Sequence, residues 1–158
     1  MNRLLLAPLL ISFSLLSSGF FFKYSNVKKL FCKNPTDFTD LSLFIDRKTG
    51  QLYIYKIDEL FTDKVPNVLI PFRGTLETKD YVMKGSSGIS AGIFRADLTR
   101  TFFDNGERNR FFYEVDLNNM TGKLIRNFPR MTTRYKKQIN YSKCEFKNLD
   151  KGLKIKDK

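Results

Sequence analysis

The sequence predicts an all-β fold behind an N-terminal apolar export segment: an antiparallel meander, closed into a small barrel or folded into a sandwich. Three observations predict it. Strand-like segments flank turns that contain glycine, apolar and polar residues alternate along several of these segments, and about seven such strands follow one another through tight turns. Barrel and sandwich both fit these patterns.

The first 22 residues predict export. Leu4–Phe22 is an almost unbroken apolar run of 19 residues behind Arg3, close to the length of a bilayer-spanning helix. Ser17–Gly19 also supplies the small residues of a cleavage site. A cleaved signal peptide and a retained signal anchor therefore stay open. In either case the rest of the chain is exported and is periplasmic or extracellular, or is anchored to the membrane by residues 4–22.

The only two cysteines, Cys32 and Cys144, bracket nearly all of the remaining sequence. In an oxidising compartment they are predicted to pair as a structural disulfide. A redox pair would normally have a short C-x-x-C spacing. The expected organisation is a linker over residues 23–31, a single β domain closed by the disulfide over 32–146, and a basic disordered tail over 147–158.

Turn residues locate two hairpins. The clearest covers residues 41–57, with its turn at Asp46–Gly50 and a positive φ expected at the glycine. A second covers residues 111–125, with its turn at Asn118–Gly122. Asp46 and Asp116 precede these turns, where an aspartate caps backbone amides.

The segment between the two hairpins is less uniform. Ile57–Lys64 also fits a short helix that ends before Pro66. Val68–Ile70 fits an edge strand or a packed loop.

Period-two alternation predicts further strands. One face of the first such segment consists of Phe94, Ala96, Leu98 and Phe102. One face of the last consists of Tyr135, Lys137, Ile139 and Tyr141. The last segment is expected to be a half-buried strand that runs toward Cys144.

Catalysis has little support in the sequence. The chain has no histidine, which removes the commonest general base and most catalytic zinc sites. Lys84–Gly88 (Lys-Gly-Ser-Ser-Gly) is the most enzyme-like fragment, since a lysine could activate Ser86 or Ser87, but its composition is typical of a flexible loop. We expect no enzyme activity, no cofactor and no bound metal.

Positive charge is concentrated at the C-terminal end. Of the formal net charge of +12, residues 120–158 contribute +9, from twelve Lys and Arg against three carboxylates. Such a patch attracts polyanions. The residues predicted to bind anions are Arg126, Arg130, Arg134, Lys136 and Lys137.

The leading functional hypothesis is a non-enzymatic exported domain that binds an anionic or amphipathic partner through this C-terminal basic strand. The expected partner is an anionic membrane surface or an acidic envelope polymer, and not nucleic acid, because the chain is exported. One alternative is a carrier of a lipid or small apolar ligand inside a barrel, motivated by the 16 Phe residues. Another is a Ser/Lys hydrolase at the Gly-Ser segment.

Overall fold

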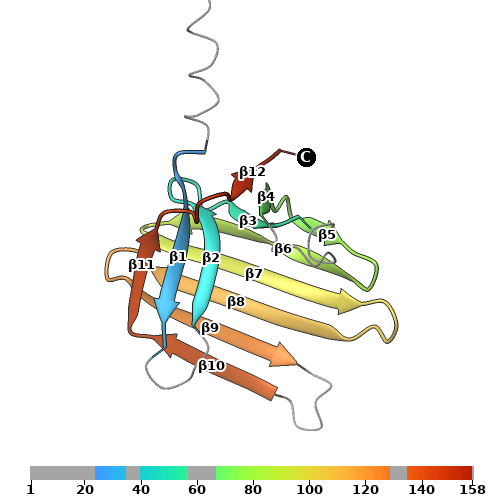
Figure 1. Ribbon diagram of the computed structural model, residues 1–158. Coiled ribbons are helices and arrows are strands. Elements are labelled where there is room, and N and C mark those ends of the chain that lie inside the picture. Colours follow the sequence, from blue (N-terminus) through green and yellow to red (C-terminus); the bar gives the residue numbers. More distant parts are fainter. Residues whose placement is uncertain (1–23, 35–39, 57–66, 129–134, 158) are drawn as a thin grey trace, which may run out of the picture.

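The computed structural model describes residues 24–34, 40–56, 67–128 and 135–157. These ranges form two six-stranded sheets and contain no helix (Figure 1). The predicted all-β class is therefore confirmed. We name the sheets by their place in Figure 1, where one lies in front of the other.

The front sheet has the strand order β11-β1-β2-β3-β4-β12. Its neighbouring strands are antiparallel except for the short parallel pair of β12 with β4. The bounds are β1 Val27–Lys33, β2 Leu41–Asp46, β3 Leu52–Tyr55, β4 Val68–Pro71, β11 Lys143–Lys147 and β12 Lys154–Ile155.

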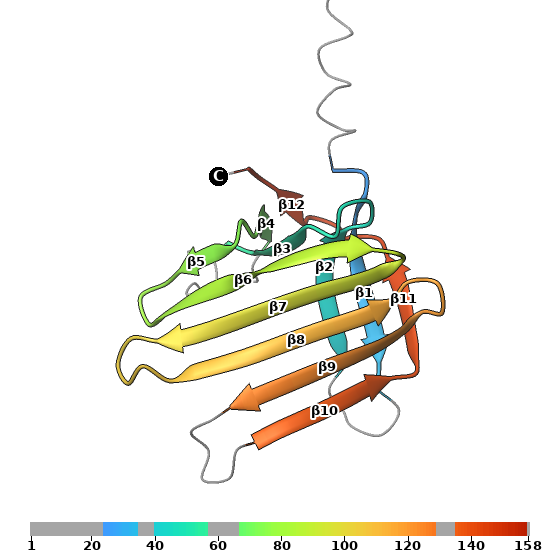
Figure 2. The same cartoon turned by 180° about the vertical axis from the view of Figure 1, so that it is seen from behind.

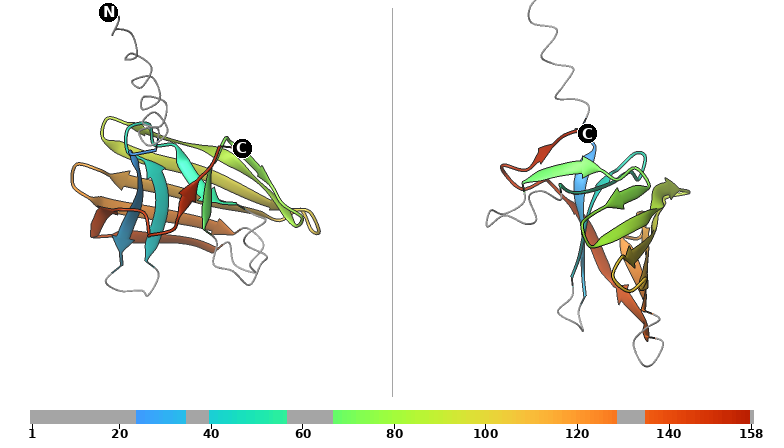
Figure 3. Two further views of the ribbon diagram at one scale, coloured as in Figure 1. Left: turned by 45° about the horizontal axis from the view of Figure 1, so that its top comes forward. Right: turned by 90° about the vertical axis from the view of Figure 1, so that its right-hand side faces the viewer.

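The back sheet is an antiparallel meander with the order β10-β9-β8-β7-β6-β5. Its bounds are β5 Thr75–Glu77, β6 Tyr81–Ser90, β7 Ile93–Phe102, β8 Arg108–Asp116, β9 Thr121–Phe128 and β10 Tyr135–Tyr141. The back sheet is curled into a half-barrel, and β1 and β2 lie across its strands (Figures 1 and 3). No strand of the described ranges covers its other face (Figure 2).

The two sheets are joined by short corners. Only Ser142 separates β10 from β11, and Phe72–Gly74 separates β4 from β5. The hydrophobic core fills the space between the sheets, with Leu30 and Ile45 from the front sheet facing Phe94 and Val115 from the back sheet, all four fully buried. The structure thus combines the two predicted architectures, since two sheets pack face to face and one of them is partly curled.

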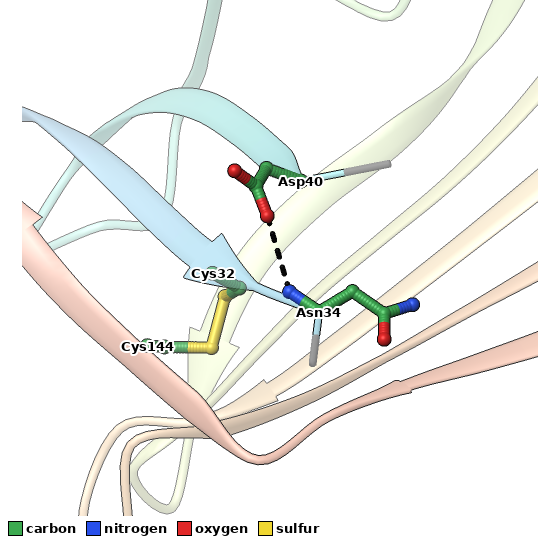
Figure 4. Close-up of a disulfide and its surroundings, with 4 residues drawn as sticks. All are labelled: Cys32, Asn34, Asp40 and Cys144. Atoms are coloured by element: carbon green, nitrogen blue, oxygen red, sulfur yellow. Dashed lines mark hydrogen bonds between the residues drawn. A yellow bond between two sulfur atoms is a disulfide. The ribbon is translucent and has the colours of Figure 1, made fainter. Parts of the chain in front are cut away.

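The predicted disulfide is confirmed. Cys32 and Cys144 are direct cross-strand partners on β1 and β11 and are bonded (Figure 4). Both are buried and point into the space between the sheets. A Cβ added to Gly122 of β9 would lie 3.2 Å from Sγ of Cys144 and 3.4 Å from Sγ of Cys32. The disulfide therefore packs on a strand of the back sheet at a glycine, which has no side chain to occupy that space.

The Gly-Ser segment is the middle of strand β6, so the prediction of a flexible loop is wrong. A Cβ on Gly50, in the β2–β3 turn at φ 74°, would lie 2.4 Å from the carbonyl carbon of Gly88. The hydroxyl oxygen of Ser87 accepts a hydrogen bond from the N–H of Leu52 at 3.0 Å. Small residues are present here because the backbones of the two sheets meet, which composition alone does not distinguish from mobility.

The structure also differs from the expected linker and tail. Residues 27–33 are strand β1 rather than part of a linker over 23–31, and β12 lies within the tail that was expected to be disordered. The physical reason is a second apolar cluster formed by Val27, Phe44, Tyr53 and Leu69. Leu149, Leu153 and Ile155 of the tail pack against this cluster and cover it.

Three smaller expectations have mixed outcomes. Val68–Ile70 lies within β4, which is an internal strand paired on both sides, not an edge. Gly50 has the expected positive φ, whereas in the second hairpin the positive φ falls on Met120. The predicted helix at Ile57–Lys64 lies outside the described residues.

Removing the disulfide should lower the free energy of unfolding. The bond closes a loop with a sequence separation of 112 residues, for which the chain-entropy model gives about 4–5 kcal/mol. We expect the double variant Cys32→Ala/Cys144→Ala to lose most of this in denaturant unfolding. Reductant should lower the free energy of unfolding of the wild type to that of the variant and should leave the variant's value unchanged. An unfolding midpoint that is unaffected by both treatments would contradict this role.

The tail should contribute to stability through its apolar residues alone. Combining Leu153→Ala with Ile155→Ala uncovers part of the second cluster and should cost about 1–3 kcal/mol. The matched control is Lys154→Ala with Lys156→Ala, because both lysines are exposed. Equal unfolding midpoints for the two double variants would show that the tail does not pack.

Candidate functional site

The structure describes the surroundings of two of the five residues predicted to bind anions. Arg126 and Lys137 are direct cross-strand partners on β9 and β10. Lys136 lies in β10 opposite Asn127, and its side chain is outside the described part of the molecule. Arg130 and Arg134 lie outside the described residues. The prediction therefore contains one adjacent pair whose surroundings the structure defines.

This pair belongs to the inner face of the back sheet, the face toward the front sheet. On that face, residues that pair directly across neighbouring strands form rows, which we call rungs. The side chains change from apolar to basic from one rung to the next. One rung is apolar throughout: Ala96, Tyr113, Leu124 and Ile139. The next contains Leu98, Phe111, Arg126 and Lys137. The rung beyond it pairs Arg100 with Asn109.

We call Arg100, Asn109, Arg126 and Lys137 the inner basic cluster. It begins where the hydrophobic core ends, since Leu98 is the last core residue of β7 before Arg100. Partly buried aromatic rings surround it. The inner basic cluster thus lies at the boundary between the core and the part of the half-barrel that none of the described strands covers.

Arg100 is held by aromatic rings. Its guanidinium carbon lies 4.8 Å from the ring centre of Phe102, 5.4 Å from that of Tyr81 and 5.5 Å from that of Phe111. Such cation–π contacts stabilise a guanidinium group by about 0.5–2 kcal/mol and fix its plane. They supply no hydrogen-bond acceptor to its Nε, which is buried and unpartnered within the described ranges.

Arg126 lies near Tyr141, which is buried, and Tyr113, which is partly buried. Burial raises the pKa of Tyr113, and the positive charges of Arg126 and Arg100 oppose that rise. Burial likewise raises the pKa of Tyr141, and Arg126 opposes the rise there too. Arg126 is therefore a positive charge beside two phenol groups that stay neutral at physiological pH.

Three polar atoms of the cluster lack partners. Nε of Arg100, Nε of Arg126 and Oδ1 of Asn109 are buried and make no hydrogen bond within the described ranges. Asn109 is only 7% exposed. Each buried unsatisfied polar group costs about 1–3 kcal/mol. Three such atoms on one face make it a candidate polar binding site.

The outer face of the same sheet shows the contrast. There Nε of Arg95 lies 2.8 Å from a carboxylate oxygen of Glu114, and Nζ of Lys123 lies 3.0 Å from the other oxygen. These two cations hold the pKa of Glu114 below its usual value. Arg110 pairs with Asp97 and lowers the pKa of that carboxyl group. In the part of the chain that the structure describes, no carboxylate pairs with Arg100 or Arg126.

Lys84, Ser86 and Ser87 do not form a nucleophile–base pair. The hydroxyl group of Ser87 is engaged with the Leu52 amide of the front sheet. Lys84 and Ser86 line a shallow hollow of about 450 Å³ on the outer face together with Asp97 and Arg110. No hydrogen bond between Lys84 and either serine occurs among the described residues, so the geometry gives the hydrolase hypothesis no support.

Sequence reasoning missed Arg100 and Asn109. Arg100 carried a signal, because it occupies the apolar register of its strand between Leu98 and Phe102. Asn109 carried none, since it lies between two exposed arginines in a polar stretch. Over the described ranges no group of His, Cys, Asp and Glu could hold a metal ion, and no helix is long and apolar enough to cross a membrane.

Comparison of the chain with protein-family models, with curated proteins and with solved structures gives no match. The functional argument therefore rests on the chemistry of the inner basic cluster. The Nε atoms of its two arginines are buried, no carboxylate within the described ranges pairs with either arginine, and the cluster adjoins apolar rings. A negatively charged group attached to an apolar body has the complementary chemistry.

Replacing Arg126 should change the titration of the neighbouring tyrosines. Without its charge the pKa of Tyr113 and of Tyr141 should rise further in Arg126→Gln, which tyrosinate absorbance measures. The pKa of a tyrosine in the folded protein is raised above its ordinary value of 10.0, which it has in the unfolded chain. The free energy of unfolding is therefore unaffected below pH 10 and falls as the pH rises above that value. The variant should therefore lose more stability at alkaline pH. Lys123→Gln, on the outer face, is the control, and an identical titration of the two variants would refute the proximity.

Proposed function

We propose that the protein is a non-enzymatic exported binding domain whose ligand is an anionic amphiphile, held at the inner basic cluster. The observation that supports this proposal is the set of three buried polar atoms without partners in the described ranges, beside the rings of Phe102, Phe111 and Phe128. The proposal joins the anion-binding and the apolar-ligand hypotheses at one place in the fold. It does not require the patch of five basic residues expected from the sequence.

Each part of such a ligand has a counterpart in the site. A carboxylate or phosphate group would accept hydrogen bonds from Arg100 and Arg126, and a guanidinium group suits both acids because its donors form a planar fork. The apolar body would lie against Phe111 and Phe128, whose ring centres are 5.6 Å apart. Exclusion of water by the rings strengthens the charged hydrogen bonds.

The export predicted from the N-terminal apolar run favours this class of ligand. An exported domain meets lipids and other amphiphiles of the envelope or the extracellular medium, while nucleic acid is scarce there. The Cys32–Cys144 disulfide agrees with an oxidising compartment. Both considerations favour a lipid-like acid over a nucleotide or a nucleic acid.

Octyl phosphate should bind saturably to the full-length chain held in nanodiscs of zwitterionic lipid. Calorimetric titration should show affinity falling about 10- to 100-fold in Arg126→Gln, the loss expected for a charged hydrogen bond. Lys123→Gln removes the same charge from the outer face and should bind as the wild type does.

Two controls separate the site from partitioning into the lipid. Octanol has the same chain without the acid and should give no saturable binding, and empty nanodiscs give the background. Equal binding of octanol and octyl phosphate, or equal affinity of the two variants, would refute the proposal.

A further inference from the structure

A second surface, distinct from the inner basic cluster, lies at the end of the molecule where β1 begins. Three chain segments meet there. The N–H of Arg47 donates to the carbonyl oxygen of Asn26 at 3.0 Å, and Nζ of Lys28 donates to Oδ1 of Asn148 at 2.8 Å. The start of β1, the β2–β3 turn and the C-terminal tail therefore share the upper end of the molecule in Figures 1 and 3.

This end is rich in exposed cations without carboxylate partners. The guanidinium group of Arg47 lies over the ring of Phe146, 4.7 Å from its centre. No salt bridge in the described ranges involves the members of the set that we call the basic end: Arg47, Lys48, Lys151, Lys154 and Lys156, all exposed.

The nearby carboxylates are already engaged. Asp46 accepts the N–H groups of Lys48 and Thr49 at 2.8 and 3.0 Å and so caps its own turn. Asp150 pairs with Lys29 at 3.6 Å, and Asp157 lies 3.9 Å from Arg73. The basic end therefore keeps an excess of positive charge that the protein itself does not neutralise.

The basic end lies close in sequence to the N-terminal apolar run, which indicates the surface that it would face. The run ends at Phe22 and β1 begins at Val27, so the connecting chain reaches at most about 18 Å. The N–H of Val27 donates to the carbonyl oxygen of Tyr24, which shortens this reach further. If the run is retained in a membrane, the basic end is the part of the domain closest to the lipid surface.

We propose that the basic end docks on an anionic lipid bilayer. Basic residues beside a membrane anchor are attracted to an anionic leaflet, and the attraction is screened within about 8 Å at physiological salt. Docking there would orient the domain with the start of β1 and the tail against the headgroups. This inference is independent of the amphiphile site, since no residue is shared.

The test is the rate of amine acylation of individual lysines, measured by mass spectrometry on the full-length chain. The chain is reconstituted in zwitterionic nanodiscs and in nanodiscs that also contain phosphatidylglycerol. Lys48, Lys151, Lys154 and Lys156 should react several-fold more slowly in the anionic discs, and high salt should abolish the difference. Lys84, exposed on the outer face of the back sheet, is the internal control and should react equally in both.

A variant makes the test specific. Lys48→Glu combined with Lys151→Glu should restore the reaction of Lys154 and Lys156 to its rate in zwitterionic discs. Equal rates for the four wild-type lysines in the two kinds of disc would overturn the proposal, as would slowing of Lys84 to the same extent. Because every substituted residue is exposed, an unchanged unfolding midpoint confirms that the variant is folded.

Discussion

The close approach of the two sheets is the constraint on which the rest of the structure depends. It occurs at two places where side chains are small or absent. Gly122 leaves room for the Cys32–Cys144 disulfide, and Gly50 meets the backbone at Gly88. Close packing of this kind excludes water and buries the apolar rungs of the back sheet. A side chain at Gly50 would clash with the backbone at Gly88, and one at Gly122 would be crowded against the disulfide.

The same constraint places the inner basic cluster. Beyond the rung of Leu98 and Phe111, the inner face carries Arg100, Asn109 and Arg126. The aromatic rings shield these groups from water without supplying acceptors. Their unsatisfied atoms contrast with Arg95 and Arg110, which find carboxylates on the outer face of the same strands. On these strands the outer-face arginines are paired and the buried Nε atoms of the inner-face arginines are not, which favours binding over stability at this place.

Local patterns predicted the class, the hairpin at residues 41–57, the buried face of β7 and the disulfide, because turn chemistry and period-two alternation depend on neighbours in sequence. The pairing of Arg126 with Lys137 depends on strand register, which one sequence does not reveal. The prediction of a flexible loop at the Gly-Ser segment was wrong because close backbone contact and mobility both favour the same small residues. The prediction of a disordered tail was wrong because the many lysines of the tail outweigh Leu149, Leu153 and Ile155 in its composition, although these three residues pack against the second apolar cluster.

The central claim is that Arg100 and Arg126, whose buried Nε atoms have no acceptor within the described ranges, bind an anion. The most direct measurement is the NMR signal of each arginine Nε–H in the full-length chain, held in zwitterionic nanodiscs and titrated with octyl phosphate. The account predicts saturable downfield shifts for Arg100 and Arg126, with Arg95 and Arg110 unchanged because carboxylates already hold them. Shifts at the outer-face arginines alone, or no shift at any of the four, would contradict it.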